Sequence, residues 1–441
     1  MKHFQKSLWS LFLLLCSVLI ISACSSSETE GTNDDASVEQ SEEKEIRYLT
    51  ASFEDEGTAS IISQLAKEYA EQHEHVTFEF ENVGGGELQQ QVQLLAASND
   101  LPAMFAFDSG QPLKALIESG AVLNIEETFK ELDIYDQLNP AAASLLTQQV
   151  DGDGLYAVPL EMNIEGFWYN KSIFEEHGLE VPTTWDEMLQ VAETLHQAGI
   201  QPFSVAGMEK WPITRLINAY VMRLYGHDVM ERVKNGEVKV TDEGFIEAAR
   251  VIQEMGLKGY FGKGVNTIDY TTATDMFLQG EAAMYYMGSW EVQAFNNEER
   301  AIIGSDNIDF FNIPLVEGGV GTLNDYSINT GLTTSFSAEA YDETMADFME
   351  YVFSNYADRA MIELGLVTPY TVSQMPDDIP RLTRLVQENI DSAENGALWF
   401  EAYFTAQEQA VAWDQAQYLV DDARFTPEFY MEELQKAMDK D

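Results

Sequence analysis

The chain has 441 residues, 45% of them hydrophobic and 22% charged, and its 75 acidic residues against 24 Lys and Arg give a formal net charge of −51. Such a charge excludes electrostatic attraction to nucleic acid or to an anionic lipid surface, since both would repel the protein. The two cysteines, Cys16 and Cys24, lie in one apolar segment, which excludes a disulfide framework for a chain of this length.

Residues 1–23 have the layout of a secretory signal peptide. Lys2 and Lys6 precede an apolar run from Leu8 to Ala23, which ends in small residues. This run is shorter than the roughly 20 residues that a membrane-spanning helix needs, so we expect cleavage rather than a transmembrane anchor. No other stretch of the sequence is long and apolar enough to span a bilayer. We therefore expect the rest of the chain, enough for two or three domains, to lie outside the cytoplasmic membrane.

The segment before Cys24 resembles the lipobox of bacterial lipoproteins. Ile21-Ser22-Ala23-Cys24 stands at the end of the apolar run. The resemblance implies that the Cys24 sulfur carries a diacylglyceryl group and that cleavage makes Cys24 the first residue. Residues 24–44 continue with serines and acidic residues and contain no aromatic residue, a composition typical of a disordered tether. The expected arrangement is a soluble body anchored by lipid at the extracellular face of the cell membrane.

From residue 45 onward, strand and helix patterns alternate. Alternating or continuous apolar runs predict strands, and apolar residues at i, i+4 spacing predict helices. The strands are expected in "EIRYLTASF" (45–53), "HVTFEFEN" (75–82) and "LPAMFAFD" (101–108), and the helices in "TASIISQLAKEYAEQ" (58–72) and "GELQQQVQLLAAS" (86–98). This alternation predicts an α/β fold with a parallel sheet, which continues through residues 235–260 and the helices from Ala338 onward.

The most informative block is "LYAVPLEMNIEGFWYNKSIFEEHGLEVPTTWDEM" at 155–188. Its pattern predicts two strands, the second of which ends at Tyr169-Asn170, and then two helices. Gly178 is expected to end the first helix, and Thr183 or Thr184 to cap the second. These local signals by themselves indicate ordinary α/β structure and no particular function.

Three motifs resemble those of the extracellular solute-binding proteins of bacterial ABC importers, in the sugar-binding group that includes maltose-binding protein. The first comprises Tyr156-Ala157-Val158-Pro159, Tyr169-Asn170-Lys171 with Phe174, Gly178-Leu179, Pro182 and Thr184-Trp185-Asp186-Glu187; the second is "FLQGEAAMYYMGSW" at 277–290, and the third is "YVFSNYADRAMIELGLVTPY" at 351–370. The motifs keep the family's order over most of residues 45–441. The chain departs from the family at Pro102-Ala103-Met104, where an Asp usually follows the Pro, so the local cap must differ there.

The resemblance implies a two-lobe α/β fold, like that of the periplasmic binding proteins, with the ligand in a cleft between the lobes and a hinge that closes on it. Lobe one would comprise 45–155 plus 312–366, and lobe two 156–311 plus 367–441, with crossings at Tyr156–Pro159 and near Ile313-Pro314. The resemblance further implies a binding protein without catalysis or cofactor, a small-molecule sugar as ligand, and the permease subunits of an ABC importer as partner. We expect a monomer that binds no nucleic acid.

A sugar presents apolar ring faces and many hydroxyl groups, so its site needs aromatic platforms with carboxylate and amide groups. Of the seven tryptophans, Trp290 follows a Gly288-Ser289 turn, and Trp211 and Trp399 stand in loops before helices. The family's counterpart of Trp290 commonly stacks on sugar. We therefore expect Trp290, with one or two of Trp211 and Trp399, to form the platforms. The other tryptophans are expected in the signal peptide (Trp9) or in the core (Trp185 and Trp413), with Trp168 open to either role.

Polar candidates follow the predicted strands, because ligands of open α/β sheets bind beyond the carboxyl ends of the strands. Asp108 ends the strand at 101–108, and Glu54 follows the first strand. Glu161 and Asn163 come just after the first crossing, where the resemblance places them toward the interlobe region. Arg is scarce and only Arg215 lies near a candidate residue, which favours a neutral sugar over a uronate that would need a bidentate Arg.

Two other classes of function stay open at this stage. A secreted glycoside hydrolase needs two carboxylates across a cleft, and acidic residues are abundant. A receptor for a quaternary amine needs several aromatic side chains around the cation, and aromatic residues are abundant too.

Metal and phosphate sites are not expected. His73 and His75 form an H-x-H pair with no Cys or third His nearby, and Tyr285-Tyr286, a pair that iron-binding relatives also have, lies within the sugar-type motif. "VGGGEL" at 83–88 lacks the Gly-Lys-Ser/Thr ending of a phosphate-binding loop, so we expect a flexible turn.

Overall fold

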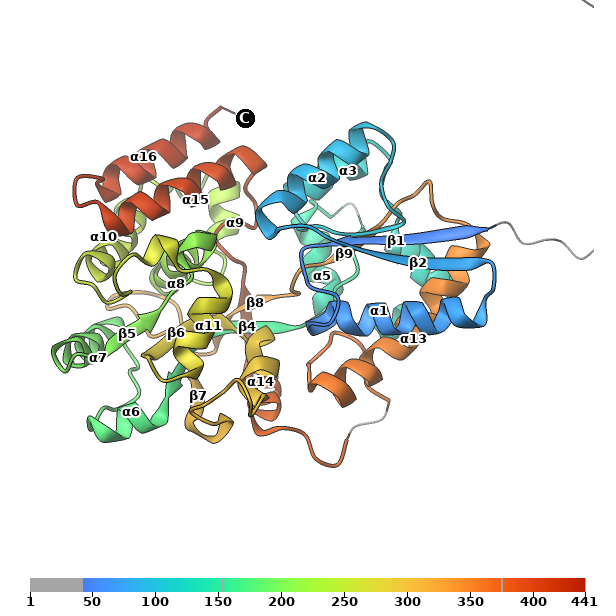
Figure 1. Ribbon diagram of the computed structural model, residues 1–441. Coiled ribbons are helices and arrows are strands. Elements are labelled where there is room, and N and C mark those ends of the chain that lie inside the picture. Colours follow the sequence, from blue (N-terminus) through green and yellow to red (C-terminus); the bar gives the residue numbers. More distant parts are fainter. Residues whose placement is uncertain (1–42, 153, 374–375, 441) are drawn as a thin grey trace, which may run out of the picture. The chain divides into compact units, whose positions relative to one another are not determined.

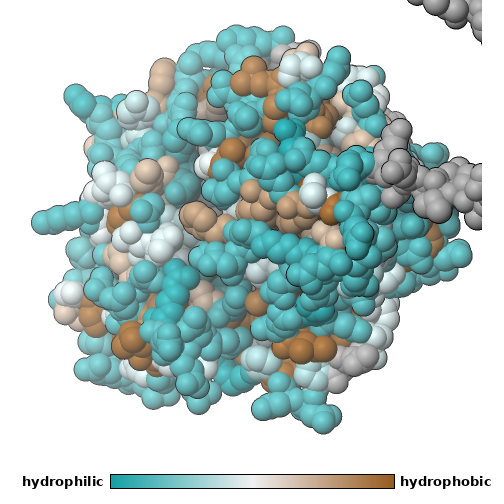
Figure 2. Space-filling view, turned by 45° about the vertical axis from the view of Figure 1, so that its right-hand side comes forward, coloured by the Kyte–Doolittle hydropathy of each residue, from teal (hydrophilic) through white to brown (hydrophobic). Residues whose placement is uncertain are grey.

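The computed structural model describes residues 43–152, 154–373 and 376–440 (Figure 1). The expected signal peptide, Cys24 and the expected tether up to residue 42 lie outside the described residues. Strand and helix alternate over residues 44–118, as the sequence predicts, and the strands of the described chain form two sheets. Within the described residues, no helix has both the length and the apolar character that crossing a membrane requires. The face in Figure 2 is mainly hydrophilic with scattered hydrophobic residues, in keeping with the net charge of −51.

The first sheet has four strands in the order β2-β1-β3-β9. They are β1 (Lys44–Thr50), β2 (Val76–Asn82), β3 (Met104–Ala106) and β9 (Thr334–Phe336). β1 pairs in parallel with β2 and β3, whereas β9 comes from much later in the chain and pairs antiparallel with β3. The helices around this sheet are α1 (Gly57–Gln72), α2 (Gly85–Ala97), α3 (Gln111–Glu118), α4 (Ile125–Glu131), α5 (Pro140–Gln149) and α13 (Glu343–Leu364) (Figure 1).

The i, i+4 pattern of α1 explains how this helix packs. Ile61 and Leu65 have no exposed surface, and they share one core with Phe348 and Val352 of α13. Figure 1 shows α1 and α13 side by side. Burial of each such side chain contributes roughly 1.5–3 kcal/mol, which fixes the later helix against the N-terminal part of the chain.

The second sheet has six strands in the order β10-β8-β4-β6-β5, and β7 also pairs with β4. They are β4 (Asn163–Asn170), β5 (Gln201–Ser204), β6 (Ala282–Gly288), β7 (Ile308–Phe311), β8 (Asp325–Asn329) and β10 (Asn395–Ala397). The helices of this part are α6 (Lys171–Glu176), α7 (Trp185–Gln197), α8 (Trp211–Tyr225), α9 (Val229–Lys234), α10 (Glu243–Leu257), α11 (Tyr270–Leu278), α12 (Val292–Asn296), α14 (Arg381–Ser392), α15 (Ala406–Asp421) and α16 (Pro427–Met438).

The predicted helix ends around α6 and α7 are present. Gly178 follows α6 with a φ of +61°, a left-handed conformation that favours glycine. Thr184 rather than Thr183 caps α7: its Oγ1 accepts from Glu187 N, and its own backbone N donates to the Glu187 carboxylate, each at 3.2 Å. Trp185 then enters the core with 2% of its surface exposed, as expected.

Trp168, whose role the sequence leaves open, belongs to the core. It has no exposed surface and packs between Phe295 and Phe310, with ring centroids 4.9 and 5.0 Å apart. Its strand β4 is buried at every residue except the half-buried Tyr169. Because both faces of this central strand are covered, alternation along the sequence does not tell inward from outward side chains.

Three segments lie together where the chain passes between the sheets. Val158 N donates to Thr334 O at 2.7 Å shortly before β4, and Met162 N donates to Val367 O at 3.1 Å. Between these, β8 ends at Asn329 in the second sheet and β9 begins at Thr334 in the first. Ile313 is fully buried in the core of the second sheet.

Candidate functional site

Three tryptophans from separate parts of the sequence gather around one arginine. Trp211 is the first residue of α8, Trp290 lies in the short helix Ser289–Glu291 that follows β6, and Trp399 follows β10. The ring centroids of Trp211 and Trp290 are 6.2 Å apart, and the Arg215 guanidinium carbon lies 5.5 Å from the Trp211 ring and 5.4 Å from the Trp399 ring. All three indoles are partly exposed, so each keeps aromatic surface that a ligand can contact.

The position of Trp290 is fixed by its neighbours. Its Nε1 donates a hydrogen bond to Tyr270 Oη at 2.8 Å, and Tyr270 in turn donates to Glu291. Gly288 leaves room for the indole, since a Cβ at this position would collide with the ring. The Gly-Ser-Trp sequence therefore places the ring directly beyond the end of β6.

Arg215 is held by two buried carboxylates. Its Nη1 donates to Glu165 of β4, and its Nε lies 3.6 Å from the Glu401 carboxylate. Glu165 and Glu401 are only 1% and 5% exposed, and Asn329 Nδ2 donates a further bond of 2.6 Å to Glu165. Burial raises the pKa of Glu401, although the Arg215 charge opposes this. The network connects β4, β8, α8 and the C-terminal region behind the tryptophans, and each buried charge in it has an opposite charge nearby.

Asp108 lies just beyond the end of β3 and is partly buried. Gln89 of α2 donates a hydrogen bond of 2.5 Å to its carboxylate. Burial raises the pKa of Asp108, whereas the Gln89 bond and the Arg215 charge lower it. Because Asp108 is within electrostatic reach of Arg215, the end of the first sheet and the tryptophan group face the same region.

Glu54 has partners of its own on α1. Its carboxylate lies 2.6 Å from Lys67 Nζ and accepts a bond of 2.7 Å from Ser63 Oγ. Both partners lower its pKa, the Lys67 bond most of all, and 41% of its side chain is exposed. These contacts explain the position of the Glu54 carboxylate without any contact to a ligand.

Glu161 and Asn163 lie where the chain enters the second sheet. Asn163 Nδ2 donates to Glu161 at 2.5 Å, and its Oδ1 accepts from Ser289 Oγ at 2.9 Å. Burial raises the pKa of Glu161 to about 7; the Asn163 bond opposes this shift, and the charge of Glu291 adds to it. Asn163 is only 3% exposed, so its amide connects β4 to the residue before Trp290 rather than facing solvent.

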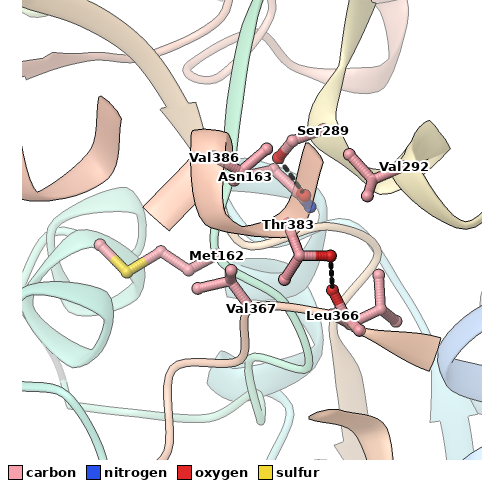
Figure 3. A pocket seen from close by; sticks show the side chains of 9 residues that line it. Met162, Asn163, Ser289, Val292, Leu366, Val367, Thr383 and Val386 are labelled. Carbon is pink, nitrogen blue, oxygen red and sulfur yellow. Dashed lines mark hydrogen bonds between the residues drawn. The ribbon is translucent and has the colours of Figure 1, made fainter. Parts of the chain in front are cut away.

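The cavity beside Asn163 is too small for a sugar (Figure 3). It encloses about 10 Å³, room for at most one water molecule. Its lining residues are Met162, Asn163, Ser289, Val292, Gly365, Leu366, Val367, Thr383 and Val386. Two hydrogen bonds seen in Figure 3 close it, one between Asn163 and Ser289 and one from Thr383 Oγ1 to Gly365 O at 2.6 Å. This cavity is therefore a small packing gap between segments and not a ligand site.

Comparison with known proteins identifies the family. Residues 55–357 match the family described as bacterial extracellular solute-binding protein. The chain belongs to that family. It is 26% identical over 288 residues to an uncharacterized ABC transporter extracellular-binding protein of Pyrococcus horikoshii, covering 63% of this chain and 66% of that one. It is 25% identical over 212 residues to a multiple sugar-binding protein of Streptococcus mutans, covering 44% of this chain and 50% of that one.

Structural similarity covers more of the chain. A chitin oligosaccharide binding protein superposes with a TM-score of 0.79 at 22% identity, over 90% of this chain and 98% of that one. This similarity confirms the predicted α/β fold. Membership of a solute-binding family confirms the prediction that the chain is not an enzyme.

This solute-binding protein brings some of the predicted site residues together and leaves others apart. Trp211, Trp290 and Trp399 form one group, with Asp108 facing it. Glu161 is connected to the group through Asn163 and Ser289, whereas Glu54 is paired on α1. Sequence patterns did not indicate the part played by Glu165, Gln89, Tyr270 and Glu401. One pattern could have indicated the position of Arg215, because it follows Trp211 by one helical turn and so shares its face of α8.

The metal alternatives gain no support from the described residues, in which no cluster of three or more His, Cys, Asp or Glu is placed to hold a metal ion. His73 stacks on Tyr69, with ring centroids 3.9 Å apart. Tyr285 and Tyr286 are 0% and 3% exposed, and their hydroxyls bond to Thr274 and to a buried glutamate.

Proposed function

We propose that this solute-binding protein captures a neutral oligosaccharide outside the cell and delivers it to the permease of an ABC importer. The observation that carries the proposal is the group of three partly exposed tryptophans beside buried carboxylates and one arginine. Indole faces suit the apolar faces of sugar rings, and carboxylates suit their hydroxyl groups. The printed names of the Streptococcus mutans and chitin-oligosaccharide proteins support a sugar as ligand.

The ligand would lie between two lobes, each built on one sheet. We propose that residues 43–155 and 334–364 belong to lobe one, and that 164–329 and 376–440 belong to lobe two. Strand β8 and the buried Ile313 favour assigning 312–329 to lobe two. The segments at 157–163, 330–333 and 365–367 would then form the hinge. Closure of the lobes would bring Asp108 toward the tryptophans and give the permease a distinct state to bind.

The charges near the tryptophans favour a neutral sugar. Arg215 is already paired with Glu165 and Glu401, so its guanidinium has no free pair of N–H groups for a bidentate bond to the carboxylate of a uronate. Arg215 also lies against Trp211 and Trp399, the positions that a quaternary amine would occupy in an aromatic cage. A second cation at that place would be repelled.

The direct test is a thermal-shift screen of neutral mono- and oligosaccharides, uronates, betaine and choline. A ligand at 100 times its Kd stabilises the folded state by about 2.7 kcal/mol. We expect stabilisation by at least one neutral oligosaccharide and none by betaine. Chromatography of the incubated sugar should show no product; hydrolysis would instead support the glycoside hydrolase, and stabilisation by betaine alone would support the amine receptor.

Replacement of the best-placed platform tests the site itself. Trp290→Ala should weaken binding of the sugar by on the order of 1–3 kcal/mol, the cost of losing one buried aromatic contact. Tyr418→Ala is the matched control, because Tyr418 is 60% exposed and lies on α15. An unchanged Kd in Trp290→Ala, measured by calorimetry, contradicts stacking on Trp290.

The lipid anchor is a separate part of the proposal and rests on the lipobox-like Ile21-Ser22-Ala23-Cys24. A single acyl chain holds a protein weakly, whereas a diacylglyceryl group supplies two. In cells, Cys24→Ala should release the protein from the membrane fraction or stop its processing. If the variant is processed and stays in the membrane fraction, the anchor is wrong while the sugar site is unaffected.

A further inference from the structure

Phe53 is an exposed aromatic residue in the turn after β1, and it does not belong to the group of three tryptophans. Its side chain is 61% exposed. Two other aromatic residues among the described residues are similarly exposed, Tyr418 at 60% and Phe429 at 46%. Both of these pack on Phe425, at centroid distances of 5.8 and 5.3 Å. Phe53, by contrast, makes no ring contact within the described part of the chain.

The backbone around Phe53 is held in place although the ring is not. Asn82 Nδ2, at the end of β2, donates to Ser52 O at 2.7 Å. Glu56 N donates to Phe53 O at 3.2 Å, and Glu54 is paired with Lys67 at 2.6 Å. The ring is therefore presented from a fixed turn, so a ligand that covers it does not have to order the loop first.

The turn stands where ligands of α/β sheets bind. β1 is an inner strand of the first sheet, between β2 and β3, and Phe53 follows its carboxyl end. Asp108 follows the carboxyl end of the neighbouring, parallel strand β3. Parallel strands have their carboxyl ends at the same edge of a sheet, so Phe53 and Asp108 share that edge.

The turn also faces the region of Trp290. Burial is the main cause of the raised pKa of Glu291, the residue after Trp290, and the charge of Glu56 makes a smaller contribution in the same direction, which places the two residues within electrostatic reach of each other. The charge of Glu56 also acts on Arg300, which follows α12. In Figure 1 the start of α1 lies at the end of the first sheet that is turned toward β4 and α14. Among the described residues Phe53 has no aromatic partner, and its turn is within electrostatic reach of the residue that follows Trp290.

We propose that Phe53 is a specificity-determining residue that stacks on the ligand from the first sheet, opposite the tryptophans of the second. This inference rests on the proposed function. Because a phenyl ring offers no polar atom to pair with hydroxyl groups, it selects ligands that present an apolar ring face on that side. The sugar is thus held between aromatic surfaces from both sheets.

The test compares Phe53→Ala and Phe53→Trp with Phe429→Ala as the matched control, since Phe429 is an exposed phenylalanine on α16. Kd is measured by calorimetry for the neutral sugar that stabilises the wild type most among maltotriose, xylotriose, chitotriose and raffinose. We expect Phe53→Ala to raise Kd at least tenfold, and Phe53→Trp and Phe429→Ala to stay within threefold of the wild type. The melting temperature without sugar should be unchanged in both Phe53 variants, because this ring is exposed and makes no ring contact among the described residues.

The outcomes separate this inference from the function on which it rests. If the wild type binds none of the four sugars nor any other in the thermal-shift screen, the proposed function fails and the role of Phe53 fails with it. If the wild type binds and Phe53→Ala stays within twofold, only the role of Phe53 is overturned. A tenfold loss in Phe53→Ala that Phe53→Trp does not restore also overturns it, because a stacking surface should be replaceable by another aromatic ring.

Discussion

Arg215→Met tests whether the charged network behind the tryptophans works as the structure indicates. The side chain of Arg215 is 14% exposed, and those of its partners Glu165 and Glu401 are 1% and 2% exposed. Removal of one partner from a buried ion pair costs roughly 3–5 kcal/mol, because the remaining charge has lost its compensation. Here two carboxylates lose their partner, while Met occupies much of the volume of the Arg stem. We expect the free energy of unfolding at pH 7.5 to fall by about 4 kcal/mol.

The pH dependence of this loss identifies its cause. Burial already raises the pKa of Glu401, and removal of Arg215 takes away the opposing charge, so the pKa should rise further. A carboxyl group with a raised pKa binds its proton more tightly in the folded state, so the variant gains stability as the pH falls toward the ordinary value of 4.5. Urea unfolding should therefore show a smaller loss at pH 5 than at pH 7.5. A loss below about 1 kcal/mol, or an equal loss at both pH values, refutes the reasoning; Arg215→Met with Glu401→Gln should recover part of the stability.

Two further predictions concern single carboxylates. Glu161 has a pKa of about 7 instead of 4.5, so the folded state holds a proton that the unfolded state has lost between these pH values, and stability should fall by up to about 3 kcal/mol as the pH rises through them. Urea unfolding of Glu161→Gln should lack this slope, and an identical slope in both proteins would show that another group causes it. Hydrogen bonds from Lys114 and Lys234 lower the pKa of Asp151 to about 2. Through these two ion pairs Asp151, which follows α5, is connected to α3 and to the last residue of α9. Asp151→Asn should raise the Kd for sugar about threefold at low salt and not at 0.5 M NaCl, because an ion pair this exposed contributes on the order of 0.2–1 kcal/mol and is screened by salt. Asp422→Asn, a substitution at an exposed carboxylate, is the control, and a salt-independent effect would contradict an ionic origin.

Local patterns predicted the elements that depend on local physics. The strands near β1, β2 and β3 and the helices between them follow from apolar spacing, and the cap at Thr184 follows from its Glu187 partner. The tryptophans could be proposed because Trp290 follows a Gly-Ser turn that resembles the family's motif, and because Trp211 and Trp399 stand in predicted loops before helices. Their convergence could not be derived, since it depends on contacts between distant parts of the chain.

The charged network and Phe53 were beyond local patterns for different reasons. Glu165 lies in a strand that is covered on both faces, and a glutamate there is tolerable only because Arg215 and Asn329 come from distant elements to meet it. Phe53 stands in a turn without periodicity, beside a glutamate that looked like the better candidate. Only its 61% exposure distinguishes it from a residue that anchors the turn in the core.

The late arrival of β9 affects the order in which the protein can fold. β3 forms early in the sequence, but its outer partner β9 is Thr334–Phe336, and α13, which packs on α1, follows that strand. During synthesis, which begins at the N-terminus, the first sheet is therefore incomplete. The edge of β3 stays unpaired until most of the second sheet has been synthesised. Contacts between such distant residues slow folding, and unpaired strand edges favour aggregation in the meantime. A chaperone that binds the nascent chain would therefore protect β3 most.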